Sequence, residues 1–259
     1  QTAAAGLTGE FGGLNMVHAD YNNDGYPDIY IIRGAWQQRN GKHPDSLLRN
    51  NGPDPKTGLI SFTDVTAEAG TGDRRYGLGI ACGDYDGDGD TDILVTNYGR
   101  CTLYRNEGGK PTRFTDATEA AGIVKTGFHT SAAWFDMDRD GDLDLFIARY
   151  LVYRPETARR CKERDLPVYC TPRLFPGEPD LLYRNLGDGT FEEVGARAGI
   201  AKAGEDEGKG LGVVTVDFDR DGFQDIYVAN DTTPNFLWRS NGDGTYTDVA
   251  YAAGVAVSG

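Results

Sequence analysis

Short apolar runs, separated by acidic and glycine-rich turns, recur along the whole chain. Four of them hold three or four residues each and lie at 29–32, 93–95, 145–147 and 226–228. They are too short for helices and rich in β-branched and aromatic side chains, so they predict buried strands. Another strand-like run precedes each acidic turn, as at 78–82 and 211–216.

A second recurring element follows each buried run. Its clearest copy is Tyr183-Arg-Asn-Leu-Gly187, and the other copies lie at 48–52, 104–108 and 238–242. Asp-Gly pairs at 188–189 and 243–244 predict tight hairpins, because glycine adopts positive φ angles at little cost. The next strand is expected to begin at Phe62, Phe114, Phe191 or Tyr246 and to end with an Ala-Gly pair, at 69–70, 121–122, 198–199 or 253–254.

Four strands joined by short turns make one blade of a β-propeller, whose two apolar faces must be covered by neighbouring blades. The sequence therefore predicts an all-β fold, with residues 1–259 as a propeller segment of four four-stranded blades. The approximate blades are 7–70, 71–122, 123–199 and 200–254, with an insertion at 153–179 in the third blade. Because Thr2–Gly6 aligns with Thr66–Gly70, we expect a piece of a larger propeller; a closed four-bladed ring is the alternative.

One acidic pattern fills the turn in every repeat. Oxygen-bearing side chains occupy positions 1, 3, 5 and 9, and glycine occupies position 6. The backbone carbonyl of position 7 is expected to join them, which explains why its side chain varies. The predicted metal ligands, loop by loop, are Asp20, Asn22, Asp24, Tyr26 and Asp28; Asp84, Asp86, Asp88, Asp90 and Asp92; Asp136, Asp138, Asp140, Asp142 and Asp144; and Asp217, Asp219, Asp221, Phe223 and Asp225.

Calcium fits this pattern, because it takes about six to eight hard oxygen ligands in a flexible geometry. Without a cation, each pair of carboxylates roughly 4 Å apart would cost about 4 kcal/mol at an effective dielectric constant of about 20. We therefore expect about four Ca²⁺ ions, one per loop. Magnesium prefers a water-rich octahedron, zinc prefers His or Cys, and position 12 lacks the Glu of an EF-hand. Asp- and Gly-rich hairpin turns without metal are the alternative, which four copies at one spacing disfavour.

Overall charge and cysteine content narrow the possible partners and compartments. The 259 residues carry 26 Lys and Arg against 40 Asp and Glu, a formal net charge of −14, which argues against nucleic acid and anionic membranes. No run of 18 apolar residues occurs, so no membrane insertion is expected. Cys82, Cys101, Cys161 and Cys170 favour an oxidising compartment and up to two disulfides, with four free buried thiols as the alternative. Cys161 and Cys170 could close a ten-residue loop.

The D-x-D-x-D-G-x-x-D loop, the strand after it and the segment 183–191 resemble FG-GAP/VCBS repeats. The same loops occur in integrin α-subunit calcium-binding blades, and segments 183–191 and 169–172 look like the cartilage-acidic-protein-like group associated with ASPIC/UnbV domains. The resemblance implies secreted or cell-surface proteins, calcium on the lower face of the propeller, and roles in adhesion or ligand binding. Asn22 departs from the pattern and is expected to weaken its site slightly.

These features favour a calcium-binding extracellular module for adhesion or for binding a protein or another ligand. The expected localisation is secreted, periplasmic or cell-surface. The partner is expected to be a protein, a glycan, or further blades or domains of the same polypeptide. Catalysis is not expected, because no nucleophile or metalloprotease motif occurs. Of the histidines His18, His43 and His129, the last is interpreted as a packing residue; a propeller hydrolase is the less favoured alternative.

Three further interpretations concern single features. A lectin-type propeller is an alternative function, with Trp36, Tyr98 or Tyr153 as stacking platforms, whereas Tyr104, Tyr183 and Trp238 are expected in the core. The insertion is either a recognition loop or a capping loop. One arginine recurs per repeat, and we expect it to pair with an acidic or backbone group rather than to form an anion site; the four are Arg49, Arg105, Arg184 and Arg239.

Overall fold

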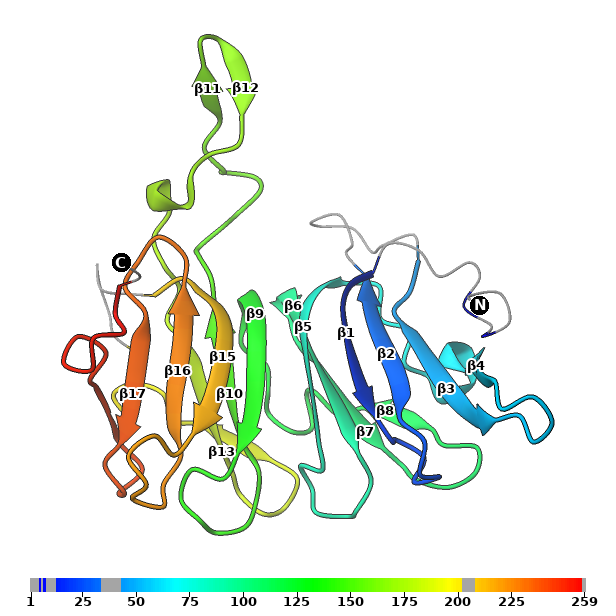
Figure 1. Ribbon diagram of the computed structural model, residues 1–259. Helices are drawn as coiled ribbons and strands as arrows, with labels where there is room; N and C mark the ends of the chain where they lie inside the picture. Colours follow the sequence, from blue (N-terminus) through cyan, green and yellow to red (C-terminus); the bar gives the residue numbers. More distant parts are fainter. Residues whose placement is uncertain (1–4, 6, 8–12, 34–42, 202–207, 258–259) are drawn as a thin grey trace. The chain divides into compact units, whose positions relative to one another are not determined.

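The computed structural model describes residues 5, 7, 13–33, 43–201 and 208–257. They form four antiparallel four-stranded blades, which confirms the predicted all-β, propeller-type fold (Figure 1). The strands of the first two blades are β1 (Gly13–Ala19), β2 (Asp28–Arg33), β3 (Ser46–Pro53) and β4 (Ile60–Asp64), then β5 (Tyr76–Gly83), β6 (Asp92–Arg100), β7 (Thr102–Asn106) and β8 (Phe114–Asp116). Those of the last two are β9 (Thr126–Phe135), β10 (Asp144–Arg149), β13 (Leu181–Asn185) and β14 (Phe191–Glu193), then β15 (Gly210–Val216), β16 (Asp225–Asn230), β17 (Phe236–Ser240) and β18 (Tyr246–Asp248).

The chain divides into two compact units, residues 1–125 with 185–191 and residues 126–184 with 192–259. Each unit has its own core, built where one face of a blade meets its neighbour. In the first unit, Tyr30 and Ile32 alternate along β2 and pack with Val95 and Tyr104 of the second blade. In the second unit, Trp238 is 1% exposed and packs with side chains of the third blade. The four apolar runs are therefore confirmed as strands; 93–95 and 145–147 are buried throughout, and 29–32 and 226–228 in part.

The last strand of each blade is shorter than predicted. Instead of running to the Ala-Gly pair, β4 ends at Asp64 and is followed by a helical turn, α1 (Thr66–Ala69). The reason is a local side-chain turn: an Asp64 carboxylate oxygen accepts hydrogen bonds from the amide and the hydroxyl of Thr66, at 3.0 and 2.6 Å. Gly70 then ends the helix with φ of 81°. Asp116, at the end of β8, accepts the same two hydrogen bonds from Thr118.

The insertion in the third blade forms a two-stranded hairpin of β11 (Cys161–Glu163) and β12 (Leu166–Val168), followed by the 3₁₀ turn η1 (Pro172–Leu174). Cys161 and Cys170 form a disulfide, as the sequence allowed. Of the up to two disulfides that the sequence allowed, this one forms. Cys82 and Cys101 are not joined in a disulfide, and burial raises the pKa of the Cys82 thiol to about 12.

Within the described residues, no helix has the length and apolar character needed to cross a membrane.

Candidate metal centres

Each acidic loop joins the first two strands of its blade and is folded by its own carboxylates. In the second loop, the position-1 residue Asp84 accepts hydrogen bonds from the amides of Asp88 and Gly89, at 3.1 and 2.9 Å. The position-9 residue Asp92 accepts from the amide of Tyr85 at 3.0 Å and from that of Asn106, at the end of β7, at 2.7 Å. The first carboxylate thus closes the loop and the last one fastens it to the sheet.

Two left-handed residues give every loop its bend. Glycine at position 6 has φ between 88° and 96°, as the prediction of a sharp bend requires. Position 4 is also left-handed, and only the second loop has glycine there; the residues are Asn23 (54°), Gly87 (72°), Arg139 (66°) and Arg220 (63°). This second bend was not predicted. The Asn and Gly at position 4 of the first two loops were the available signal.

Three loops bring three carboxylates together. One ligand oxygen from each of positions 1, 3 and 9 lies within 4.8 Å of the others, and the groups are Asp84, Asp86 and Asp92; Asp136, Asp138 and Asp144; and Asp217, Asp219 and Asp225. In the first loop, position 3 is Asn22, an amide in place of a carboxylate, and this loop is not among the three clusters. The structure therefore provides three acidic clusters that could hold a metal ion.

The residues at positions 5 and 7 lie differently from the clusters. Position 5 does not belong to the three groups; Asp88, for example, accepts a hydrogen bond from the Asp90 amide at 2.9 Å, and Asp24, Asp140 and Asp221 do the same for their own position-7 amides. The position-7 side chains point to neighbours instead. Asp90 accepts a hydrogen bond from Asn23 of the first loop at 2.8 Å, and the rings of Tyr26 and Phe223 lie against Gly52 and Gly242.

The electrostatics of the loops show the cost of gathering these carboxylates. Burial raises the pKa of Asp92 to about 7 and that of Asp28 to about 6, against the hydrogen bonds that each accepts. Burial, followed by the charge of the position-5 aspartate, also raises the pKa of Asp86 and Asp138. One oxygen of Asp138 is buried without a hydrogen-bond partner. Such an oxygen, within a cluster of anions, suits a hard cation.

A tether between blades supports each of two loops, and the repeated Arg-Asn pair was its only signal in the sequence. The fully buried Asn106 donates through its side-chain amide to the Tyr21 carbonyl, at position 2 of the first loop, over 2.8 Å. Asn185 makes the same 2.8 Å bond to the Tyr85 carbonyl of the second loop. Loop shape is therefore coupled to the packing of neighbouring blades.

The recurring arginines behave unequally. The prediction of a structural pairing is confirmed for Arg105, which forms a forked contact with Glu107 at 2.7–3.0 Å. Arg184 approaches Asp138 at 4.0 Å. Within the described chain, Arg49 and Arg239 have no carboxylate within ion-pair distance.

The other singled-out residues fall on different surfaces. His129 is fully buried within β9, in agreement with a packing role, and Tyr104, Tyr183 and Trp238 lie in the core as predicted. Tyr98 and Tyr153 are half-buried. Trp36 lies outside the described residues.

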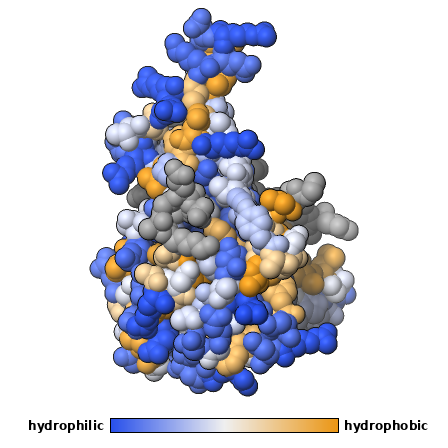
Figure 2. All heavy atoms as spheres, turned by 90° about the vertical axis from the view of Figure 1, so that its left-hand side faces the viewer, coloured by the Kyte–Doolittle hydropathy of each residue, from blue (hydrophilic) through white to orange (hydrophobic). Residues whose placement is uncertain are grey.

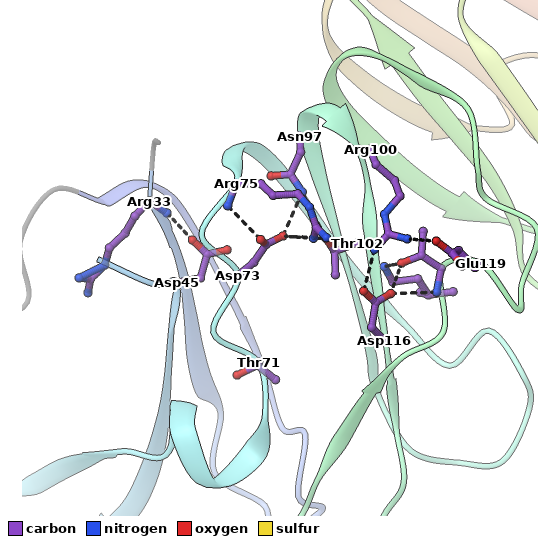
Figure 3. Close-up of polar contacts among 12 residues, drawn as sticks. Arg33, Asp45, Thr71, Asp73, Arg75, Asn97, Arg100, Thr102, Asp116 and Glu119 are labelled. Atoms are coloured by element: carbon purple, nitrogen blue, oxygen red, sulfur yellow. Dashed lines mark hydrogen bonds and ion pairs between the residues drawn. The ribbon is translucent and has the colours of Figure 1, made fainter. Parts of the chain in front are cut away.

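Another set of carboxylates lies at the opposite end of β2 and β3 from the first loop (Figure 3). Asp45 is 1% exposed and accepts hydrogen bonds from the Arg33 amide at 2.7 Å and the Tyr30 hydroxyl at 3.3 Å. Burial raises its pKa to about 7. Asp73 differs, because its pKa is lowered overall. Burial raises the pKa, but hydrogen bonds from the Thr102 hydroxyl and the Arg75 amide, together with the Arg75 charge, lower it by more. These carboxylates were not predicted as a site, and their contacts hold strand ends together.

Four-stranded blades with an acidic loop between the first two strands define the class of this protein, a propeller built from acidic-loop repeats. The chain belongs to the FG-GAP-like repeat family, whose sequence pattern matches residues 20–95, 84–147 and 174–228.

Curated relatives include cartilage acidic protein 1 from Mus musculus and Homo sapiens, each 26% identical over 266 residues, and from Xenopus tropicalis, 27% identical over 232 residues. Each match covers 88% of this chain but only 40%, 39% and 30% of the relatives, respectively.

Similar solved structures include an Agrocybe aegerita lectin that recognises non-reducing terminal N-acetylglucosamine (TM-score 0.43, 18% identity, 89% of this chain and 49% of the lectin). The V. cholerae biofilm matrix protein Bap1 is also similar (TM-score 0.35, 16% identity, 89% of this chain and 38% of Bap1).

Proposed function

We propose that this chain is a calcium-stabilised, extracellular β-propeller module that works by binding a partner. The observation that carries the proposal is the repeated acidic cluster. Three loops place three carboxylates with oxygens within 4.8 Å of one another, and the cluster of Asp138 keeps a buried oxygen without a partner. Carboxylates this close repel strongly unless a cation lies between them.

The donor set selects the metal. The described clusters contain carboxylates and no His or Cys, which favours Ca²⁺ or Mg²⁺ over Zn²⁺. In the three clusters, positions 1, 3 and 9 would supply three carboxylate ligands, and calcium accepts such a crowded and irregular set of oxygens better than magnesium does. A bound ion would cancel the repulsion and hold the turn between the first two strands of its blade.

Several observations support a binding role outside the cytoplasm. The disulfide between Cys161 and Cys170 fits an oxidising compartment, and the relatives are named as acidic proteins of cartilage. His129 is fully buried in β9, which removes it from contact with a substrate. We therefore propose a secreted, periplasmic or cell-surface module that acts through its surfaces.

Calcium removal tests the proposal directly. A site filled at about 100 times its Kd adds about 2.7 kcal/mol, and each kcal/mol moves Tm by about 2–4 °C in a domain of this size. With three or four sites, we expect EDTA to lower Tm by more than about 10 °C and CaCl₂, but not MgCl₂ at the same concentration, to restore it. An unchanged Tm in EDTA contradicts a structural role for calcium.

A matched pair of variants tests the ligand assignment. Asp138→Asn keeps the shape of the side chain, and Asn22 shows that this position accepts an amide. We expect calorimetry to show one site weakened about tenfold or more, because calcium affinity follows the number of charged ligands. The control, Glu119→Gln, removes the same charge from an exposed residue outside the clusters and should leave the calcium titration unchanged. Identical titrations for both variants exclude Asp138 as a ligand.

A further inference from the structure

The hairpin of the insertion stands away from the blade that carries it. Figure 1 shows β11 and β12 beyond the ends of β10 and β13, at the end of the second unit opposite the loop that joins β15 and β16. Its base is fixed by a backbone hydrogen bond from the Val152 amide to Pro176 at 3.0 Å and by an ion pair between Arg149 and Glu178 at 3.4 Å. Its upper part is cross-linked by the disulfide.

A loop that merely capped the blade would bury its apolar side chains, and this hairpin exposes them. Tyr169 is 100% exposed and Leu166 is 69% exposed. Figure 2 shows the hairpin as the projecting upper part of the molecule, strongly hydrophilic at its tip with hydrophobic residues beneath. A disulfide-linked projection with uncovered apolar groups fits a recognition loop better than a cap.

The hairpin is also basic in a protein that is acidic overall. Residues 153–179 contain six Lys and Arg against four Asp and Glu, whereas the whole chain has 26 against 40. Elsewhere arginines reach carboxylates, as Arg105 reaches Glu107 and Arg197 reaches Glu192, at 2.7 and 2.8 Å. In the described chain, no carboxylate pairs with the cations of the hairpin that flank its disulfide, which are Arg159, Arg160 and Lys162.

These cations share a cavity of about 440 Å³ with aromatic rings. Tyr153 and Phe175 form one wall, with ring centroids 5.9 Å apart, and Tyr169 adds a third ring. Lys162 is paired with Pro167 across the hairpin, which places both on one face. The cavity is therefore an open pocket with aromatic walls and unpaired positive charge.

We propose that this pocket, which we call the hairpin pocket, binds an anionic polysaccharide through its carboxylate or sulfate groups. Guanidinium groups match planar or tetrahedral oxyanions with two parallel hydrogen bonds, and tyrosine rings present flat apolar faces to sugar rings. A volume of this size accepts a ligand of small-molecule dimensions, such as a few sugar units of a chain, rather than a folded protein surface. This inference rests on the proposed binding function and names its ligand class.

The test uses the full chain with bound calcium and four probes: polygalacturonate for carboxylates, dextran sulfate for sulfates, neutral dextran and poly-L-glutamate. We expect binding to at least one anionic polysaccharide, weakening as salt rises, and no binding to neutral dextran. If neither polygalacturonate nor dextran sulfate binds, the proposal is overturned. Poly-L-glutamate binding as tightly as the best polysaccharide overturns the saccharide assignment.

Matched variants locate the site. Arg159→Gln/Arg160→Gln should lower affinity at least tenfold, whereas the control Lys56→Gln/Arg239→Gln, which removes the same charge from the blades, should change it less than twofold. Tyr169→Ala should lower affinity for the polysaccharide several-fold, a loss that a purely charge-driven contact would not show. Equal affinities of the charge variant and its control, or no effect of the tyrosine change, overturn the proposal.

The calcium role is read separately in the same samples, from the shift of Tm on EDTA addition. If no anionic polysaccharide binds but EDTA still lowers Tm, only the proposal for the hairpin pocket is contradicted. An absent calcium shift with hairpin-dependent binding contradicts only the calcium part of the proposed function.

Discussion

The buried carboxylate of Asp45 allows a direct test of how burial of an ionisable side chain affects the stability of this fold. Its side chain is 1% exposed and accepts hydrogen bonds from the Arg33 amide and the Tyr30 hydroxyl. Burial raises its pKa to about 7, the charge of Asp73 adds to the rise, and the hydrogen bonds and the Arg33 charge only partly oppose it. The perturbation that we choose is Asp45→Asn, which removes the ionisable group and keeps an oxygen for the Arg33 amide.

The sign of the pH dependence follows from the proton count. In the unfolded chain, an aspartate releases its proton near pH 3.9, whereas the folded protein holds the proton of Asp45 up to about pH 7. Between these values the folded state binds more protons, so the free energy of unfolding falls as pH rises from about 4 to about 7 and is level above that. About three pKa units correspond to as much as about 4 kcal/mol.

Asparagine should fit the site, because the fourth blade already uses it. Asn235 precedes β17 as Asp45 precedes β3, and it accepts a hydrogen bond from the Asn230 amide at 2.9 Å. We therefore expect Asp45→Asn to match the wild type near pH 4 and to exceed its stability above pH 7, by as much as about 4 kcal/mol.

The assay is urea unfolding followed by circular dichroism at several pH values from 4 to 8, at one calcium concentration. The quantity compared is the difference in free energy of unfolding between variant and wild type, which cancels the titration of the acidic loops. Glu119→Gln, at an exposed carboxylate, serves as the control and should follow the wild type. Parallel pH profiles for Asp45→Asn and the wild type would refute the reasoning, as would a variant less stable above pH 7.

Three further predictions concern the loops, the tethers and the hairpin. Arg220→Gly should raise stability by about 0.5–1 kcal/mol, since its φ of 63° is strained for a residue with a Cβ; a lower Tm would contradict this. Asn106→Ala should cost at least about 2 kcal/mol in denaturant unfolding because it strips buried carbonyls of their donor, whereas the exposed Asn241→Ala should cost less than about 1 kcal/mol; equal costs would argue against the tether. Cys161→Ser/Cys170→Ser should change the Tm of the blades by less than about 2 °C and speed proteolysis of 153–179. The reason is that the roughly 2.5–3 kcal/mol by which a disulfide stabilises a ten-residue loop acts only within the hairpin. A large fall in Tm would mean that the hairpin supports the blade.

Much of the fold could be predicted because each blade is a local unit. Runs such as 145–147 and 226–228 carry enough apolar and β-branched residues to become central strands; the first is fully buried, and in the second Ile226 and Val228 are buried. The prediction of the last strand was wrong because its end depends on a side-chain turn: Asp64 accepts hydrogen bonds from Thr66, and a helical turn follows where the apolar pattern alone continued the strand. A side-chain hydrogen bond of this kind produces no periodic pattern of apolar residues in the sequence.

The candidate metal sites could likewise be predicted only in part from the sequence. The spacing of aspartates within a loop predicted which side chains gather, and three clusters form at positions 1, 3 and 9. Spacing could not separate position 5 from the rest, because that depends on which amides the carboxylates of Asp84 and Asp88 accept from. It also could not show the bond from Asn106 to Tyr21, which joins residues 85 apart.

The sequence by itself determined the repeat, the strands and the acidic loops, because short-range steric preferences and hydrophobic alternation act within a few residues. The tertiary structure alone decided which carboxylates are buried, that Cys82 and Cys101 are not joined in a disulfide, and that three cations of the hairpin are left without carboxylate partners. Those outcomes depend on which distant segments pack together, and burial and pairing set the free energy of a charge or a thiol only once that packing exists.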